Sequence, residues 1–316
     1  MAKEAKQKTF IMTGGSSGLG RWTVEALTDA GHRVVLGARQ PERVDAPSQV
    51  EVLPLELGSL RSVAAFAERC PEADGLLANA GLQLVDAPTM TEDGFERTFA
   101  VNHLAHVALL AHVLPKLRRG ARAVFTISGT HDPQDTGAGL FGFRGGLFTS
   151  PERMAAGDLG RTDGRSVRLQ GMDRYATSKL ANVMTVNEVA RRFAASRLSV
   201  FGFDPGLVPA TGLARAQPAG LRWVYAVLGP VLTWLPFAST PQRSGASLAW
   251  LATDPSLADR SGGHFDFRRE PLKVWNGSYD EARCRELLDE SLRLTGVALP
   301  EAETAPRHGT YGSRAK

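Results

Sequence analysis

The 316-residue sequence contains little cysteine, no uninterrupted apolar run of membrane-spanning length and little excess charge outside its ends. Its two cysteines, Cys70 and Cys284, form no C-x-x-C pair, which excludes a disulfide framework and a thiolate metal site. The apolar stretch 221–237 contains Arg222 and Pro230 and is shorter than the ~20 residues of a spanning helix, so we expect a helical lid and no membrane span. The polar start MAKEAKQK does not resemble a signal peptide, and we expect a cytoplasmic location.

The formal net charge of +4 is concentrated at the two ends of the chain. Residues 1–8 carry +2 and residues 307–316 carry +3, which leaves the body of the chain close to neutral. We expect residues 1–8 and 299–316 to be solvated tails. The neutral body predicts no nucleic-acid partner.

Short β-branched runs alternate with helix-period segments along the chain. This alternation predicts an α/β protein over residues 9–298, with a single Rossmann-type doubly wound parallel sheet and helices on both of its faces. Two segments interrupt the pattern: 131–174, expected to be a long insert, and 207–240, expected to cover a substrate. Within the insert we expect an irregular segment from Ser150 to Met172, and then a helix from about Arg174 to Ala195.

The stretch TGGSSGLG, Thr13 to Gly20, permits two interpretations. Its first glycines satisfy G-x-S-x-G, the spacing of a hydrolase nucleophile elbow with Ser16 as nucleophile. In hydrolases an earlier strand supplies the oxyanion loop, but here the first expected strand comes directly before the glycines. We therefore favour a phosphate-binding turn, in which the glycines allow close backbone approach and the next helix directs its free amides at a pyrophosphate.

The end of the second expected strand indicates which dinucleotide binds. NAD-binding folds place an acidic residue about 20 positions after the glycines, whereas NADP-binding folds place a cation near the 2′-phosphate. Nineteen positions after Gly20 the sequence has Arg39, followed by Arg43, and no acid. The planar guanidinium suits a phosphate, so the sequence predicts NADP(H), with a solvated surface arginine as the alternative.

A catalytic pair is indicated by the segment Tyr175-Ala-Thr-Ser-Lys179. On a helix, the i, i+4 spacing places the phenol and the ammonium on one face. A free tyrosine has a pKa of about 10, and a neighbouring cation stabilises the phenolate. We therefore expect Lys179 to lower the pKa of Tyr175, which suits a general acid or base.

These motifs together resemble the short-chain dehydrogenase/reductase family. The resemblance rests on TGGSSGLG, LANAG, VNHLAH, RAVFTIS, YATSKLANV and DPGLVPATGL, and it covers the chain from Thr9 to about Val297. Within the family, NHLAH, SKLANVMTVNEVARRF and TPQRSGASLAWLATDPSLADRSG are similar to the branch that holds retinol dehydrogenases and light-dependent protochlorophyllide reductases.

The resemblance implies catalytic roles at four positions. Asn102 would stabilise the site and a water relay, and Ser128 would hydrogen-bond the substrate carbonyl. Tyr175 would donate the proton, while Lys179 would bind the nicotinamide ribose and lower the pKa of the tyrosine.

It also implies a set of cofactor-binding positions, among which Asn79 would hold the strand near the adenosine ribose. Pro205-Gly206 would pass over the nicotinamide, and Thr211 would contact its carboxamide. The full set is Gly14, Ser16, Ser17, Gly18, Leu19, Gly20, Arg39, Glu56, Leu57, Asn79, Ala80, Gly81, Tyr175, Lys179, Pro205, Gly206 and Thr211.

Three positions depart from the family pattern. Ala78 stands where the family often has a second asparagine, and Glu56 stands where an aspartate commonly contacts adenine; neither change is expected to abolish cofactor binding. Leu207 follows the Pro-Gly directly, where protochlorophyllide reductases carry a cysteine. Without that proton donor, light-driven ring reduction is not favoured, whereas carbonyl reduction needs no such thiol.

Other candidate residues have simpler interpretations. His103 and His106 lack a third ligand at suitable spacing, so we expect them to pack or hydrogen-bond and predict no metal site. His131 and Asp132 are chain neighbours, which rarely point together, so we expect loop residues and no Ser-His-Asp relay. The aromatic residues of 207–240 either line a lipophilic pocket or pack the lid, and both interpretations stay open: Trp223, Tyr225, Trp234 and Phe237.

The leading interpretation is an NADPH-dependent reductase or dehydrogenase that acts on the carbonyl or alcohol of a bulky, fairly apolar substrate. A protochlorophyllide-type reduction of a C=C double bond is the alternative among enzymes. A dinucleotide-binding sensor is the alternative outside them, but binding alone does not require Tyr175. The sequence leaves open whether the chain is a homo-oligomer or a monomer.

Overall fold

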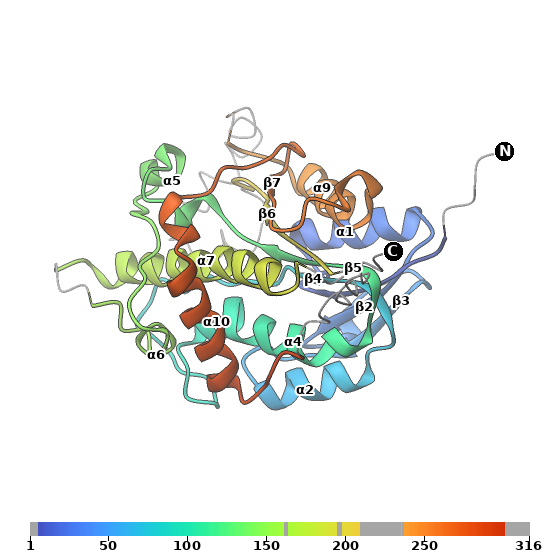
Figure 1. The fold of residues 1–316 in the computed structure, drawn as a ribbon, viewed down its shortest axis with the longest axis horizontal. Coiled ribbons are helices and arrows are strands. Elements are labelled where there is room, and N and C mark those ends of the chain that lie inside the picture. The colour runs from blue at the N-terminus through green and yellow to red at the C-terminus, as the bar shows by residue number, and fades with distance from the viewer. Residues whose placement is uncertain (1–5, 161–163, 195–197, 209–234, 236, 301–316) are drawn as a thin grey trace, which may run out of the picture.

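A computed structural model describes residues 6–160, 164–194, 198–208, 235 and 237–300. The described strands form one parallel seven-stranded sheet in the order β3-β2-β1-β4-β5-β6-β7 (Figure 1). The chain order reverses between β1 and β4, where ligands of doubly wound sheets bind. The strands are β1 (Thr9–Thr13), β2 (Arg33–Ala38), β3 (Val50–Pro54), β4 (Ala73–Ala78), β5 (Leu117–Thr126), β6 (Ser199–Asp204) and β7 (His264–Asp266).

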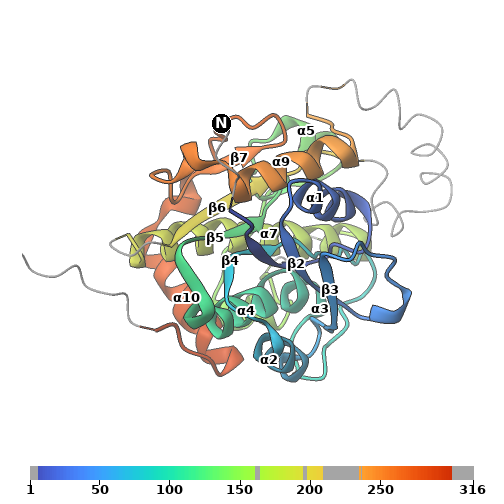
Figure 2. The ribbon, with the colours of Figure 1, turned by 90° about the vertical axis from the view of Figure 1, so that its right-hand side faces the viewer.

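Helices cover both faces of the sheet, as the alternation predicts (Figure 2). One side holds α1 (Gly18–Asp29) and α9 (Pro241–Thr253), which pack on each other. The other side holds α2 (Leu60–Arg69), α4 (Ala105–Val113), α7 (Val167–Arg192) and α10 (Glu281–Thr295). Short helices precede α4 and lie in the insert: α3 (Arg97–Phe99), α5 (Thr136–Leu140) and α6 (Pro151–Ala155).

The central strands divide their side chains between two apolar cores. In β1, Ile11 joins the core beneath α2, α4 and α10, while Phe10 and Met12 join the core beneath α1 and α9. This division follows from the two-residue period of a strand, which turns successive side chains to opposite faces. Because both faces are buried, the strands read as continuous apolar runs in the sequence.

The start of α7 and the segment before it differ from the sequence-based expectation. The helix begins at Val167, not near Arg174, because the Ser166 side chain accepts a hydrogen bond from the Leu169 amide and caps it. Gly171 obscured this turn in the sequence, since glycine weakens helices. Here a Cβ at Gly171 would lie 2.6 Å from the Cα of Val85, so the close approach of that loop requires glycine.

One helical run, Arg97–Lys116, is long and apolar enough to cross a membrane, but 83% of its window is buried inside the protein, as expected of a core helix. Several sequence-based expectations fall outside the described residues. These are most of the 207–240 lid with its tryptophans, Thr211, and the ends of both tails.

Candidate active site

The glycine-rich turn follows β1 at the carboxyl edge of the sheet. Gly14 and Gly18 have positive φ angles of 69° and 58°, which side chains rarely adopt. A Cβ at Gly14 would lie 2.7 Å from the Cα of Ala80, and one at Gly20 would overlap the carbonyl oxygen of Gly14. The turn therefore packs so tightly against α1 and the loop after β4 that only glycine fits.

The first turn of α1 presents uncapped amides next to this turn. Ser17 occupies the N-cap position with an extended backbone, but its side chain makes no capping hydrogen bond, and the first helical turn holds no acidic residue. Ser16 and Ser17 are exposed. Open amides and the positive end of a helix dipole fit an anion such as a pyrophosphate.

Asn79 ties the glycine turn to the middle of the sheet. Its side-chain amide donates to the carbonyl oxygens of Thr13 (3.3 Å) and Gly14 (3.1 Å), and its Oδ1 accepts from the Thr126 hydroxyl (3.2 Å). The Thr13 hydroxyl in turn accepts from the backbone amides of Asn79 (3.1 Å) and Ala80 (3.0 Å). These bonds hold the ends of β1, β4 and β5 in one frame.

Arg39 leaves β2 beside the glycine turn. Thr13 pairs in register with Gly37, so the residues that follow each of them emerge side by side from adjacent strands. Arg39 is exposed and is therefore accessible to a phosphate. In the loop after β3, Glu56 directs Oε1 to its own loop and accepts from the Gly58 amide at 2.9 Å, next to Leu57.

Tyr175 and Lys179 lie on the inner face of α7, only 5% and 3% exposed. The Tyr175 phenol hydrogen-bonds Ser128, the second residue after β5. The Lys179 ammonium lies 5.7 Å from the centroid of the Tyr175 ring and donates to the Thr126 carbonyl at 2.9 Å. The structure thus brings three of the predicted catalytic residues together.

The expectation that Lys179 lowers the pKa of Tyr175 is wrong for this structure. Burial raises the pKa of Tyr175, the hydrogen bond from Ser128 opposes that rise, and the carboxylate of Asp204 adds to it. The ammonium faces the tyrosine ring and the Thr126 carbonyl, and desolvation lowers the pKa of Lys179 to about 8, with Asp204 acting to raise it. The sequence showed the spacing of the pair but not its burial.

Asn102 lies in a π-helical turn, Ala100–Leu104, of the kind often found at functional sites. Its side chain accepts from the Leu82 amide (2.8 Å) and donates to the Leu82 carbonyl and to Ser178 (both 2.9 Å). A Cβ at Gly81 would lie 3.4 Å from Asn102 Oδ1 and 3.6 Å from Lys179 Nζ. Asn102 therefore fixes the loop after β4 beside the lysine; its predicted water relay stays a prediction.

His103 and His106 are buried hydrogen-bonding residues. His103 bonds Asn182 (3.1 Å) and the Ser291 hydroxyl (2.9 Å), and His106 bonds Thr13 (2.9 Å) and the Asn102 carbonyl (3.1 Å). Burial lowers the pKa of each to about 4. In the part of the chain that the structure describes, no three potential ligands come together as a metal site.

His131 does not complete a hydrolytic relay. Its Nδ1 donates to the backbone carbonyl of Ser128 at 2.6 Å, not to the hydroxyl, and the Asp132 carboxylate accepts from the Gln134 amide. His131 ends a short 3₁₀ helix, Gly129–His131, and was therefore wrongly expected in a loop, whereas Asp132 follows the helix.

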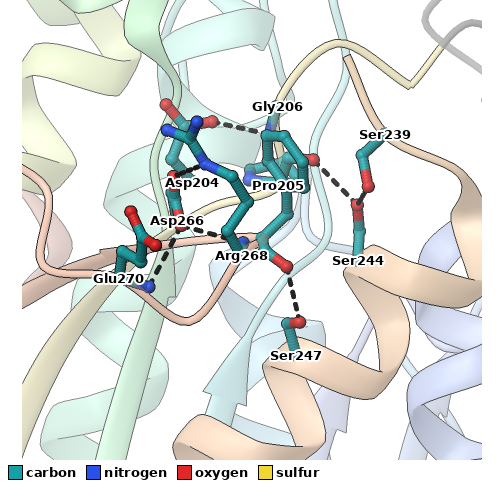
Figure 3. A network of polar contacts seen from close by, with 10 residues as sticks. Asp204, Pro205, Gly206, Ser239, Ser244, Ser247, Asp266, Arg268 and Glu270 are labelled. Carbon is teal, nitrogen blue, oxygen red and sulfur yellow. Dashed lines mark hydrogen bonds and ion pairs between the residues drawn. The ribbon is translucent and has the colours of Figure 1, made fainter. Parts of the chain in front are cut away.

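The Pro205-Gly206 turn follows β6 and lies within a network of polar contacts (Figure 3). Gly206 has a φ of 69° and donates its amide to the Asp204 carboxylate at 2.8 Å. The Ser244 hydroxyl of α9 donates to the Pro205 carbonyl at 2.8 Å. Asp204 was not among the predicted site residues, although its position directly before Pro-Gly could have indicated it.

A profile described as short chain dehydrogenase matches residues 8–137. Retinol dehydrogenase 13 of Homo sapiens is 30% identical over 95% of this chain and 88% of its own. Protochlorophyllide reductase A of Oryza sativa subsp. japonica is 29% identical over 93% of this chain and 82% of its own. A solved structure from Mycobacterium paratuberculosis covers 93% of this chain and 95% of its own with a TM-score of 0.66 at 26% identity.

The chain belongs to the short-chain dehydrogenase family, and it is an oxidoreductase whose relatives are NAD(P)-dependent dehydrogenases and reductases. Its doubly wound parallel sheet agrees with that assignment.

Proposed function

We propose that the protein is an NADPH-dependent reductase of a carbonyl group on a bulky, fairly apolar substrate, able to run in reverse as an alcohol dehydrogenase. The observation that carries the proposal is the convergence of Ser128, Tyr175 and Lys179 beside the loop after β4. NADPH supplies the hydride when bound, and the chain's own residues supply the proton.

The phenol of Tyr175 is the proposed proton donor. Ser128 hydrogen-bonds the phenol and offers its hydroxyl to the same carbonyl oxygen, which polarises the carbonyl. As hydride adds to the carbonyl carbon, the Tyr175 proton passes to the oxygen and an alcohol forms. The phenolate left behind is then reprotonated, and the Lys179 ammonium, 5.7 Å from the centroid of the tyrosine ring, would bind the nicotinamide ribose.

Cofactor choice rests on Arg39. Its guanidinium emerges next to the glycine turn, where it suits the 2′-phosphate of NADPH. Gly14, Gly18 and Gly20, with the open amides of α1, form the proposed pyrophosphate cradle.

The proposed substrate class rests on an aromatic ring beside the tyrosine. The ring of Phe143, from the insert, lies 6.2 Å from that of Tyr175 with an interplanar angle of 52°. Phe141 and Phe148 of the same segment are half-buried, and Phe148 packs on the cluster that contains Phe99. An apolar ring against the proton donor favours an apolar substrate, and one relative's name, retinol dehydrogenase, refers to such a molecule.

Reduction of a C=C double bond is the second candidate, because protochlorophyllide reductase A is similar to this chain to nearly the same degree. Leu207, whose amide donates to the Phe237 carbonyl, provides no proton directly after Pro-Gly, whereas Ser128 and Tyr175 converge as a carbonyl site requires. A sensor that only binds the dinucleotide does not need the buried tyrosine. The cytoplasmic location stays a prediction, and the oligomeric state stays open.

Replacing Tyr175 with phenylalanine tests the chemistry. The ring keeps its packing but loses its proton, so we expect NADPH binding to persist while turnover falls by ~10²-fold or more. The assay follows NADPH absorbance with retinal, an apolar aldehyde, and glyceraldehyde, a small polar one. Asn276→Ala on the exposed turn before α10 is the control. A variant that keeps most of its activity rules out Tyr175 as proton donor.

A further inference from the structure

Asp204 joins two loops of the candidate site. It is the last residue of β6, and its carboxylate accepts from the backbone amide of Gly206 at 2.8 Å and from that of Gly129. A Cβ at Gly129 would lie 3.6 Å from Asp204 Oδ2, so the Gly129 backbone lies close to this carboxylate. One side chain thus holds the loop that carries Ser128 against the Pro205-Gly206 turn.

The same carboxyl group is buried close to the catalytic pair; burial raises its pKa, whereas the Gly206 amide and His131 act to lower it and so favour its ionised form. The titratable groups that face it are His131 and Asp135 from the insert and Tyr175 and Lys179 from α7. His131 is 2% exposed, and within the described residues its Nε2 has no hydrogen-bond partner. No arginine among the described residues forms an ion pair with Asp204, so its charge acts on this cluster.

Asp266 provides a natural comparison on the next strand. It pairs in register with Asp204, ends β7, and accepts from the backbone amide of Arg268 at 2.8 Å (Figure 3). The Arg268 guanidinium also binds its carboxylate at 2.7 Å. The two aspartates therefore share position and turn geometry, but the charge of Asp266 is neutralised.

We propose that Asp204 is a positioning residue that couples the Ser128 loop to the Pro205-Gly206 turn and that its negative charge favours carbonyl reduction over alcohol oxidation. The part of this inference that concerns reduction and oxidation rests on the proposed function. A carboxylate near the phenol disfavours the phenolate. Reduction needs the protonated phenol, whereas oxidation needs the phenolate as base.

The charge is tested with Asp204→Asn, which keeps an acceptor for the Gly206 amide but removes the charge. We expect the rising limb of the pH profile for retinol oxidation with NADP⁺, and the falling limb for retinal reduction, to move to lower pH by about one unit. Asp266→Asn should leave both limbs in place. Asp204→Ser, also a neutral acceptor, serves if the asparagine variant does not fold.

The coupling is tested without turnover by hydrogen–deuterium exchange. Asp204→Ala should speed exchange in the peptides that contain Gly129 and Gly206 together, Asp204→Asn should speed it less, and Asp266→Ala should change neither. Unchanged exchange in Asp204→Ala overturns the proposal, as do pH profiles that coincide for the Asp204 and Asp266 asparagine variants. If Tyr175→Phe stays active, the proposed function fails, while the exchange data still decide whether Asp204 couples the loops.

Discussion

At the scale of single residues, the proposed preference for NADPH rests on the charge of Arg39. Arg39 is exposed and adjoins the glycine turn. It stands at the end of β2, where NAD-binding folds place an acidic residue. A guanidinium–phosphate pair is charge-assisted and bidentate, and contributes about 1.5–3 kcal/mol. NADH lacks the phosphate and therefore gains nothing from this side chain.

We therefore expect NADPH to bind roughly 10- to 150-fold tighter than NADH. Arg39→Ala should remove most of that preference and leave NADH affinity nearly unchanged, as measured by fluorescence titration. Arg33→Ala, an exposed arginine at the opposite end of β2, is the matched control. Equal affinities for the two dinucleotides in the unaltered protein would contradict the assignment.

At the scale of elements, buried ion pairs fix the start of α7, just before Tyr175. Arg165 of the insert binds Asp173 at 2.7 Å, with side chains 7% and 4% exposed. The next residue, Arg174, lies 3.5 Å from the fully buried Glu96 and donates to the Asp86 carbonyl at 2.6 Å. The insert therefore determines the orientation of the helix that carries the catalytic pair.

Breaking the first of these pairs should destabilise the protein. Asp173→Asn leaves the buried Arg165 charge uncompensated, and we expect a loss of about 3–5 kcal/mol with lower turnover. Asp158→Asn breaks an exposed pair with Arg153 in the same insert and should cost less than about 1 kcal/mol. Urea denaturation with both variants measures the difference; similar losses would show that α7 does not depend on the Arg165 pair.

Local spacing explains which elements could be predicted. The glycine turn, α1 and the Tyr175–Lys179 pair depend on residues a few positions apart, and the sequence identified all three. The early start of α7 could not be predicted, because Gly171 is compatible with a helix only when the loop at Val85 packs against it. Asp204 and the raised pKa of Tyr175 depend on contacts between segments distant in the chain.

At the scale of the whole molecule, buried neutral histidines make the fold sensitive to acid. Desolvation lowers the pKa of His103 and His106 to about 4 and that of His264 to about 3. In the unfolded chain these rings titrate near pH 6.5. Below that pH the unfolded state binds protons that the folded state does not, so stability is lost as the pH falls from 6.5 toward 4.

We expect each of these histidines to lower the free energy of unfolding by roughly 1–2 kcal/mol between pH 7.5 and pH 5. The thermal unfolding midpoint should therefore be several degrees lower at pH 5. His103→Gln, which can still bond Asn182 and Ser291, should show a smaller drop. A midpoint independent of pH over this range would mean that the rings are accessible to protons in the folded state.

The two cysteines give the molecule a practical property. Both thiols are buried and point at carbonyl oxygens of their own neighbourhood, and desolvation raises the pKa of each to about 12. At neutral pH neither is a nucleophile, so alkylating dyes have no native target in the folded chain. A cysteine introduced at the exposed Leu140, three residues before Phe143 in the insert, could therefore be labelled with a fluorophore without removal of the two native cysteines. The emission of that fluorophore would report on ligand binding near Phe143.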